Sequence, residues 1–235
     1  NGVEYDNIMM AMSAYMECLS NIPVGDAAKA CGHLFDQLEE YVEASEESRA
    51  YEIMLELVEK YLYDPNSPYR NEDIYLPFVK AVAESELTDD DLRAVYVYAS
   101  QMCSMNRYGE MVPDFLFKDA TGRSRRLYDI KADNVLLFFS NPGCYACRGI
   151  MEKIDGMEGV SDMIAEGRLA VVNIYIDEDL EAWREYQVGY PKNWYNGYDP
   201  DLVIRDDRLY NVRAIPSLYL LDGEKRVIMK DAPDI

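Results

Sequence analysis

The residues with the clearest chemistry are Cys144 and Cys147, which stand at C-x-x-C spacing with Tyr145 and Ala146 between them. A cysteine thiolate is a nucleophile, and two cysteines this close can switch between a dithiol and a disulfide. The pair therefore predicts thiol–disulfide exchange, provided that the surrounding elements expose one sulfur and lower the pKa of its thiol.

The flanking sequence predicts a strand and a helix that expose one sulfur and lower the pKa of its thiol. The apolar run Val135–Phe139 is typical of a strand buried on both faces, and the turn-forming residues 140–143 end it. After the cysteines, apolar residues recur at helical spacing: Ile150, Met151, Ile154 and Met157. A helix N-terminus lowers a cysteine pKa, so Cys144 is expected to attack and Cys147, one turn inside the helix, to resolve the mixed disulfide. A strand, a tight loop and C-x-x-C at a helix start indicate a thioredoxin-like redox site.

Two further motifs carry a family resemblance. Before the strand stand Gly109, Pro113-Asp114-Phe115, Asp119, Gly122 and Leu127; after it, residues 210–223 include Ile215-Pro216 and end in Asp222-Gly223. With the C-x-x-C in order between them, this stretch, about Gly109 to Lys230, resembles the TlpA-like and ResA-like thiol–disulfide oxidoreductases. Those proteins are extracytoplasmic relatives of thioredoxin.

The resemblance implies a thioredoxin-like α/β domain over residues 107–235, with a central mixed sheet flanked by helices. It implies a cis bond before Pro216, so that the Ile215 backbone faces Cys144 and pairs with an extended substrate. Ile215, Pro216 and Tyr145 are the expected substrate contacts. No cofactor is expected beyond the Cys144–Cys147 disulfide. The expected partners are protein thiol or disulfide substrates and a redox partner protein. The expected location is outside the cytoplasm, specifically the periplasm, with a lipid anchor through a removed N-terminal signal.

The sequence departs from this family at several positions. Thioredoxin has a buried acid six residues before its first cysteine, where this chain has Phe138, and ResA-like proteins have a glutamate where it has Ile150. Gly143 stands where relatives often have tryptophan. The usual internal proton acceptor is therefore missing, and we also expect the domain to lack its terminal helix.

Residues 1–106 predict a separate all-helical module of four or five helices. Apolar residues repeat at helical spacing, as at Leu34, Leu38 and Val42, and a proline-containing break follows at residues 64–68. Thr88 before three aspartates predicts a helix N-cap. The module resembles an uncharacterised segment often fused ahead of such domains, and its function does not follow from its sequence.

The remaining cysteines leave two interpretations open. Cys18 and Cys31 flank a predicted helix break and could form a disulfide across a helix hairpin, or they could be buried apolar residues like Cys103. A metal site at His33 and Cys31 is disfavoured, because this is the single histidine and no second C-x-x-C is present.

The aromatic stretch 187–200 is expected to be an irregular insertion. Tyr190, Trp194, Tyr195 and Tyr198 could contact a partner beside the redox site or pack the loop onto its own domain.

Composition limits the classes of partner. The chain has 235 residues and a net charge of −21, which disfavours nucleic acid and anionic membranes. No apolar run is long enough for a membrane helix.

Three other functions fit parts of the sequence less well than thiol–disulfide exchange does. One is a redox-silent interaction protein whose helical module binds a partner, although a disulfide across so short a loop stabilises a fold little. A peroxiredoxin fits poorly, because Asn141 stands where such enzymes have threonine. A zinc site fits worst, since a single C-x-x-C is present.

Overall fold

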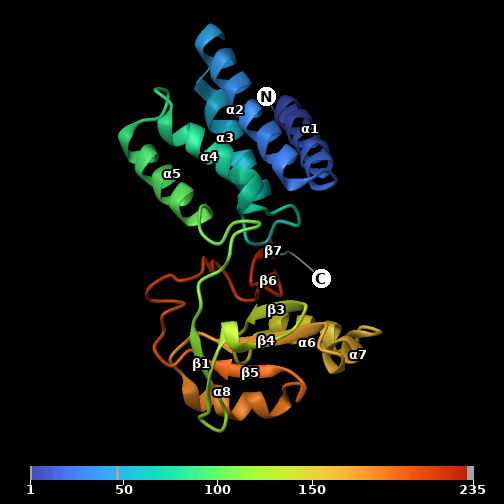
Figure 1. Cartoon of the computed structure of the whole chain (residues 1–235). Helices are drawn as coiled ribbons and strands as arrows, with labels where there is room; N and C mark the ends of the chain where they lie inside the picture. Colours follow the sequence, from blue (N-terminus) through green and yellow to red (C-terminus); the bar gives the residue numbers. More distant parts are fainter. Residues whose placement is uncertain (1, 46–47, 232–235) are drawn as a thin grey trace. The chain divides into compact units, whose positions relative to one another are not determined.

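The computed structural model describes residues 2–45 and 48–231. By their internal contacts these fall into two compact units, Asn1–Met105 and Asn106–Ile235 (Figure 1). The first unit is helical, and the second is built on one β-sheet.

The helical unit contains α1 (Gly2–Ser20), α2 (Val24–Ser45), α3 (Ser48–Leu62), α4 (Glu72–Glu84) and α5 (Asp90–Cys103). The break before α2 and the proline-containing break before α4 lie where the sequence predicts them. The buried face of α2 includes Cys31, Phe35, Leu38 and Val42, so Phe35 rather than Leu34 belongs to its central stripe. The ring of Phe35 packs edge-on against Phe78 of α4 at a centroid distance of 5.4 Å, which joins the buried faces of α2 and α4.

The predicted cap of α5 was wrong by one residue. Asp89 is the N-cap, and its side chain accepts a hydrogen bond from the backbone N–H of Leu92 at 2.9 Å. Thr88 is buried instead, donating to the carbonyl of Val82 at 2.7 Å and sharing a hydrogen bond with the Tyr51 hydroxyl at 2.6 Å. The aspartate also places negative charge at the positive end of the helix, which favours it as the cap.

The second unit has a seven-stranded mixed sheet in the order β2-β1-β5-β4-β3-β6-β7. Its strands are β1 (Leu116–Asp119), β2 (Ser124–Arg126), β3 (Asn134–Phe139), β4 (Leu169–Tyr175), β5 (Tyr195–Tyr198), β6 (Ser217–Asp222) and β7 (Val227–Lys230). Its helices are α6 (Tyr145–Gly156), α7 (Val160–Ala165) and α8 (Leu180–Tyr186), with 3-10 turns η1 (Leu127–Asp129) and η2 (Gln187–Gly189). This is the predicted thioredoxin-like layout, and the predicted fold class is confirmed.

Strand β3 lies in the interior of the sheet and packs on both faces, as its apolar run predicts. It pairs in parallel with β4 and antiparallel with β6. Val135, Leu137 and Phe139 belong to one apolar cluster, which also contains residues of η1 and of the segments around Phe115 and Tyr210. Phe138 belongs to the cluster on the opposite face, with residues of α6. The redox helix therefore packs directly on β3.

The prediction for residues 187–200 was wrong in part, because they include a strand of the sheet. Strand β5 pairs in parallel with β4 and antiparallel with β1. Tyr190 and Trp194 are 3% and 6% exposed, so these two aromatic residues pack onto their own domain. The strand has the sequence Tyr-Asn-Gly-Tyr, which offers little β-propensity and no apolar alternation, so pairing with its neighbours rather than local preference determines it.

The face of the sheet that carries α6 also has an apolar hollow of about 450 Å³. Apolar side chains from α6, α7 and four strands contribute to its lining, among them Leu136, Met157, Leu218, Leu220 and Met229. Part of this face is therefore not filled by the described helices.

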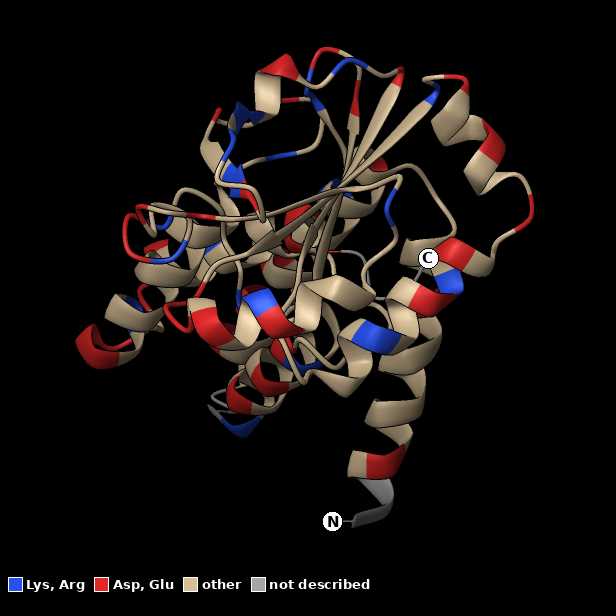
Figure 2. Ribbon diagram, turned by 90° about the horizontal axis from the view of Figure 1, so that it is seen from below, with Lys and Arg blue, Asp and Glu red and all other residues tan. Residues whose placement is uncertain are grey.

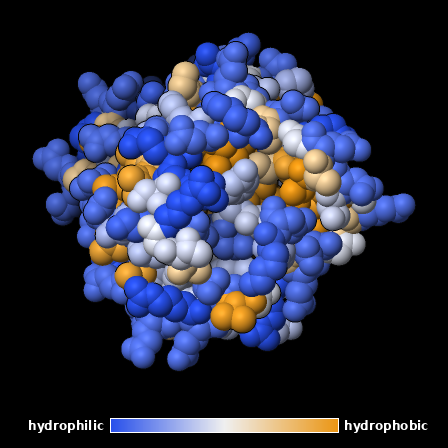
Figure 3. Space-filling model, turned by 60° about the horizontal axis from the view of Figure 1, so that its bottom comes forward, coloured by the Kyte–Doolittle hydropathy of each residue, from blue (hydrophilic) through white to orange (hydrophobic). Residues whose placement is uncertain are grey.

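The surface is largely polar and acidic. Aspartates and glutamates lie along helices and loops throughout the chain (Figure 2), and in Figure 3 apolar side chains show as separate patches on a mostly hydrophilic surface. Within the described residues, no helix combines the length and apolar character that crossing a membrane requires.

We predict that Gly197→Ala destabilises the second unit by about 1–3 kcal/mol, because an added methyl group overpacks the contact between β5 and β1. A Cβ at this position would lie 2.5 Å from the Phe117 ring and 2.9 Å from the Lys118 carbonyl oxygen. Urea unfolding measures the free energy of unfolding of this variant, of a control variant and of the natural protein. Gly149→Ala is the matched control, because a Cβ there meets nothing within 4 Å, and alanine should stabilise helix α6 by about 0.5–1 kcal/mol. Equal stability of the Gly197→Ala variant and the natural protein would contradict the prediction.

Candidate active site

Cys144 and Cys147 are joined by a disulfide at the N-terminus of α6. Cys144 is the N-cap, and its Sγ accepts a hydrogen bond from the backbone N–H of Cys147 at 3.1 Å. Cys144 is half-buried, whereas Cys147 is 2% exposed. The helix N-terminus therefore presents one sulfur to solvent and holds the other in the core, an arrangement that suits an attacking and a resolving cysteine.

The loop before Cys144 explains the glycine at position 143. Gly143 has a φ of +72°, in the left-handed region where a side chain is strained. The turn closes with a hydrogen bond from the Cys144 N–H to the Asn141 carbonyl at 3.3 Å. A tryptophan with this backbone conformation would be strained, so the departure at Gly143 follows from the loop geometry.

The Ile215–Pro216 segment lies beside the dithiol. The bond between these residues is cis, and Ser217, the next residue, is the register partner of Phe139 at the end of β3. Ile215 packs against the same apolar cluster as Cys144, and both Ile215 and Pro216 are half-buried. The structure thus brings Ile215 together with both cysteines. Tyr145 is 88% exposed and points away from the core.

A buried ion pair joins this segment to the residue that follows β7. Arg213 Nη2 lies 2.6 Å from Asp231 Oδ2, with side chains only 11% and 8% exposed. Ser217 Oγ donates to the other oxygen of the same carboxylate at 3.4 Å. The end of β7 therefore holds both sides of Pro216 in place.

Arg148 contacts α8 rather than the sulfurs. Its Nη2 donates to the Tyr186 hydroxyl at 2.6 Å, and its guanidinium carbon lies 5.7 Å from the centroid of the same ring. The hydrogen bond to Tyr186 raises the pKa of Arg148. The side chain is exposed, so it links the start of α6 to the end of α8 on the surface.

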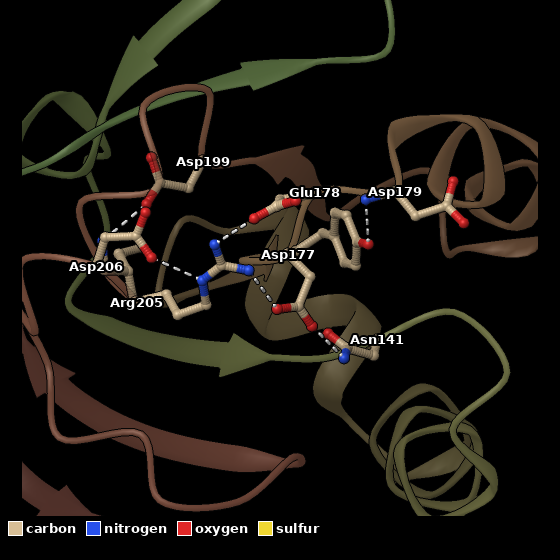
Figure 4. Close-up of polar contacts among 9 residues, drawn as sticks. Asn141, Asp177, Glu178, Asp179, Asp199, Arg205 and Asp206 are labelled. Carbon is tan, nitrogen blue, oxygen red and sulfur yellow. Dashed lines mark hydrogen bonds and ion pairs between the residues drawn. The ribbon is translucent and has the colours of Figure 1, made fainter.

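A second link joins the active-site loop to the segments that follow β4 and β5 (Figure 4). Asn141 Nδ2 donates to Asp177 Oδ2 at 2.7 Å, and Arg205 Nη1 donates to the other oxygen of that carboxylate at 3.2 Å. Arg205 also pairs with Glu178 and Asp206, at 2.7 and 2.8 Å. Because three carboxylates share one guanidinium, this cluster orders the loop that precedes Cys144.

The position of the missing carboxylate is apolar. Phe138 is fully buried in the cluster that contains Cys147. Its register partner on β4 is Asn173, which is 1% exposed and accepts a hydrogen bond from Ser140 Oγ at 2.5 Å. Tyr190 is buried nearby on the same face of the sheet, and burial raises the pKa of its hydroxyl. The sequence analysis assigned no role to Asn173 or to its bond with Ser140, although a lone asparagine inside the apolar run of β4 was a usable signal.

Solved structures of other proteins are similar to this chain in sequence and fold. A thioredoxin-like protein from Bacteroides caccae is 35% identical to this chain in sequence and superposes on it with a TM-score of 0.88. The match covers 97% of this chain and 80% of that protein. This chain belongs to the thioredoxin-like proteins. The C-terminal domain of an uncharacterized protein from Bacteroides fragilis is 41% identical over 54% of this chain and 91% of its own, with a TM-score of 0.52.

The helical module of this thioredoxin-like protein also has relatives. Residues 3–106 match the family described as Domain of unknown function (DUF5106), which confirms the predicted uncharacterised module. No curated protein matches the chain.

The other thiols of this thioredoxin-like chain lie in the helical unit and are not in disulfides. Cys18 is exposed, whereas Cys31 and Cys103 are buried. A Cys18–Cys31 disulfide is therefore not formed. His33 is exposed and contacts Asp36 at 3.2 Å, so it faces away from buried Cys31. Among the described residues, no group of three or more potential ligands is placed to hold a metal ion.

We predict that iodoacetamide at pH 8 labels Cys18 of the folded protein at least about a hundredfold faster than Cys31, because the thiolate is the reactive form. Burial raises the pKa of Cys31 to about 12, which keeps this thiol protonated at pH 8. Peptide mass spectrometry after timed labelling measures both rates, and labelling in urea should bring them together. Similar rates in the folded protein would contradict the predicted burial of Cys31.

Proposed function

We propose that this chain is a thiol–disulfide oxidoreductase that reduces protein disulfides through Cys144 and Cys147. The observation that carries the proposal is the half-exposed Cys144 bonded to buried Cys147 at the start of α6, beside the Ile215–Pro216 segment. This arrangement separates an accessible nucleophile from a protected resolving thiol.

The reaction conserves atoms and electrons. In the reduced protein the Cys144 thiolate attacks one sulfur of a substrate disulfide, forming a mixed disulfide and releasing the other substrate sulfur, which takes up a proton. Cys147 then loses its proton and attacks Cys144 Sγ, which releases the second substrate sulfur. Two electrons pass from the dithiol to the substrate, and a redox partner protein must restore the dithiol.

The substrate is expected to bind in an extended conformation beside the dithiol. The backbone of Ile215 would pair with it, and Pro216 and exposed Tyr145 would contact its side chains. Backbone pairing is tolerant of sequence, because it reads main-chain groups rather than side chains. This mode suits a protein that reduces more than one disulfide partner.

The resemblance to TlpA-like and ResA-like proteins supports a location outside the cytoplasm. A disulfide persists more readily there than in a reducing cytosol. Specifically, the proposal places the protein in the periplasm, attached to a membrane by a lipid anchor.

The redox-silent alternative makes a different use of the same structure. In it the helical module binds a partner and the Cys144–Cys147 disulfide is structural. The disulfide closes a loop of sequence separation 3, so its removal should cost little stability. The alternative therefore gives no reason for the two cysteines to be placed at a helix N-terminus.

We predict that Cys144→Ser abolishes reduction of insulin by the protein in the presence of dithiothreitol, because the attacking thiolate is lost. Cys147→Ser should instead accumulate a mixed disulfide with the substrate, since the second step is removed. Turbidity follows insulin reduction, and non-reducing electrophoresis detects the trapped adduct.

Cys18→Ser is the matched control, as it removes an exposed thiol from the helical unit. It should retain full activity. Undiminished insulin reduction by Cys144→Ser would end the proposal, whereas no insulin reduction by the natural protein would favour the redox-silent interaction protein.

A further inference from the structure

One carboxylate holds both ends of the segment 213–217. Arg213 Nη2 lies 2.6 Å from Asp231 Oδ2, and Ser217 Oγ donates to Asp231 Oδ1 at 3.4 Å. Asp231 follows β7, an edge strand of the sheet, and Ser217 begins β6, the strand beside it (Figure 1). The segment is therefore a short loop whose two ends are attached to a single side chain. We call Arg213, Ser217 and Asp231 the carboxylate clamp.

The clamp is buried. The side chains of Arg213 and Asp231 are 11% and 8% exposed, and Ser217 is fully buried. Moving two charges out of water is costly, so a buried ion pair often stabilises a protein no more than apolar residues of similar size do. Its charge-assisted hydrogen bonds are directional, however, and fix both partners in one geometry. The pair is thus better suited to positioning the segment than to stabilising the fold.

Between the clamped ends lies backbone that the fold leaves unpaired. The Ile215 side chain packs against the apolar clusters on both faces of the sheet. Neither its N–H nor its carbonyl has a hydrogen-bond partner among the described residues. Unpaired backbone groups beside a strand can pair with the main chain of an extended polypeptide. The side chain is therefore fixed in the core while the backbone groups are left for a partner.

We propose that the carboxylate clamp positions the substrate-binding backbone: it holds the Ile215 N–H and carbonyl in the orientation that pairs with the main chain of an extended protein substrate. The inference rests on the proposed function. Ile215 packs against the same apolar cluster as Cys144, so a polypeptide paired with its backbone would have its disulfide beside the attacking sulfur. The bonds of the clamp hold the segment and not the sulfurs, so Arg213, Ser217 and Asp231 are positioning residues for binding.

A backbone that is held in place binds a partner more tightly, because the entropy of ordering it is lost before the partner arrives. Without the clamp, residues 213–217 would adopt several conformations, and only a fraction of the molecules would present Ile215 for pairing. The apparent affinity for a polypeptide falls by that fraction, whereas the reaction of a bound substrate does not change. The expected signature is a higher substrate concentration at half-maximal rate with an unchanged maximal rate.

The test compares a disulfide that has a polypeptide main chain with one that lacks it. Reduced protein is mixed with excess insulin or bis(2-hydroxyethyl) disulfide, quenched in acid at set times and alkylated with N-ethylmaleimide, and mass spectrometry measures how much has been oxidised. In Arg213→Met, the insulin concentration at half-maximal rate should rise about tenfold, while the maximal rate changes less than about twofold. The rate constant with bis(2-hydroxyethyl) disulfide should also change less than about twofold, because this molecule has no main chain to pair.

Two further variants separate position from stability. Asp231→Asn removes the charge but keeps the shape of the side chain, and asparagine tolerates the left-handed backbone of this residue, whose φ is +47°. It should raise the insulin concentration at half-maximal rate in the same direction. Combining Arg213→Met with Asp231→Asn leaves no lone charge buried, so the double variant carries the test where a single variant fails to fold. It should still require more insulin, because methionine forms no directional bond with residue 231.

Arg126→Met is the matched control. Arg126 Nε lies 2.6 Å from Asp114 Oδ2, the same distance as in the clamp, but Arg126 belongs to β2, at the opposite edge of the sheet from β7. The control should leave the kinetics with both disulfides unchanged.

Equal slowing with insulin and with bis(2-hydroxyethyl) disulfide in the folded clamp variants would overturn the inference. Unchanged insulin kinetics in these variants, or the same rise in Arg126→Met, would overturn it as well. Failure of the proposed function has a separate signature, because the natural protein would then not reduce insulin at all.

Discussion

The structure of the second unit depends on the packing of α6 against the interior strand β3. Phe138 of β3, Cys147, Met151 and Ile154 of α6 share one buried cluster, so the resolving cysteine is part of the core. This packing holds the start of the helix at the end of the strand, where Gly143 turns the chain and Cys144 emerges. Chemistry and stability therefore share the same contacts.

Around that contact, separate polar links fix the segments that meet at the dithiol. Asn141 and Asp177 tie down the loop before Cys144, and Arg213 and Asp231 hold the chain around Pro216. Each link joins a loop to the end of a strand. The apolar core places the sheet and α6, and charge-assisted hydrogen bonds then set the loops within that frame.

The absence of a carboxylate beneath the dithiol changes what the core can do. Phe138 adds apolar contact where an acid would be costly to bury, and polar groups are displaced to the neighbouring strand as Asn173 and its partners. A buried acid exchanges protons, whereas the hydrogen-bonded Ser140 and Asn173 side chains are neutral and offer only dipoles. The thioredoxin-like fold thus keeps its geometry while the electrostatics of its interior differ.

The sequence by itself determined the features that depend on local pattern: the helical first hundred residues, the buried strand, the helix start at Cys144 and the fold class. The sequence did not determine the N-cap of α5, because Thr88 and Asp89 are adjacent and both residue types cap helices. It did not determine strand β5 either, because Tyr-Asn-Gly-Tyr forms a strand only by pairing with its neighbours in the sheet. Only the tertiary structure brought Ser140, Asn173 and Asn196 together. Their hydrogen bonds join the loop after β3 to strands β4 and β5, which are far apart in sequence, and no local spacing encodes such a contact.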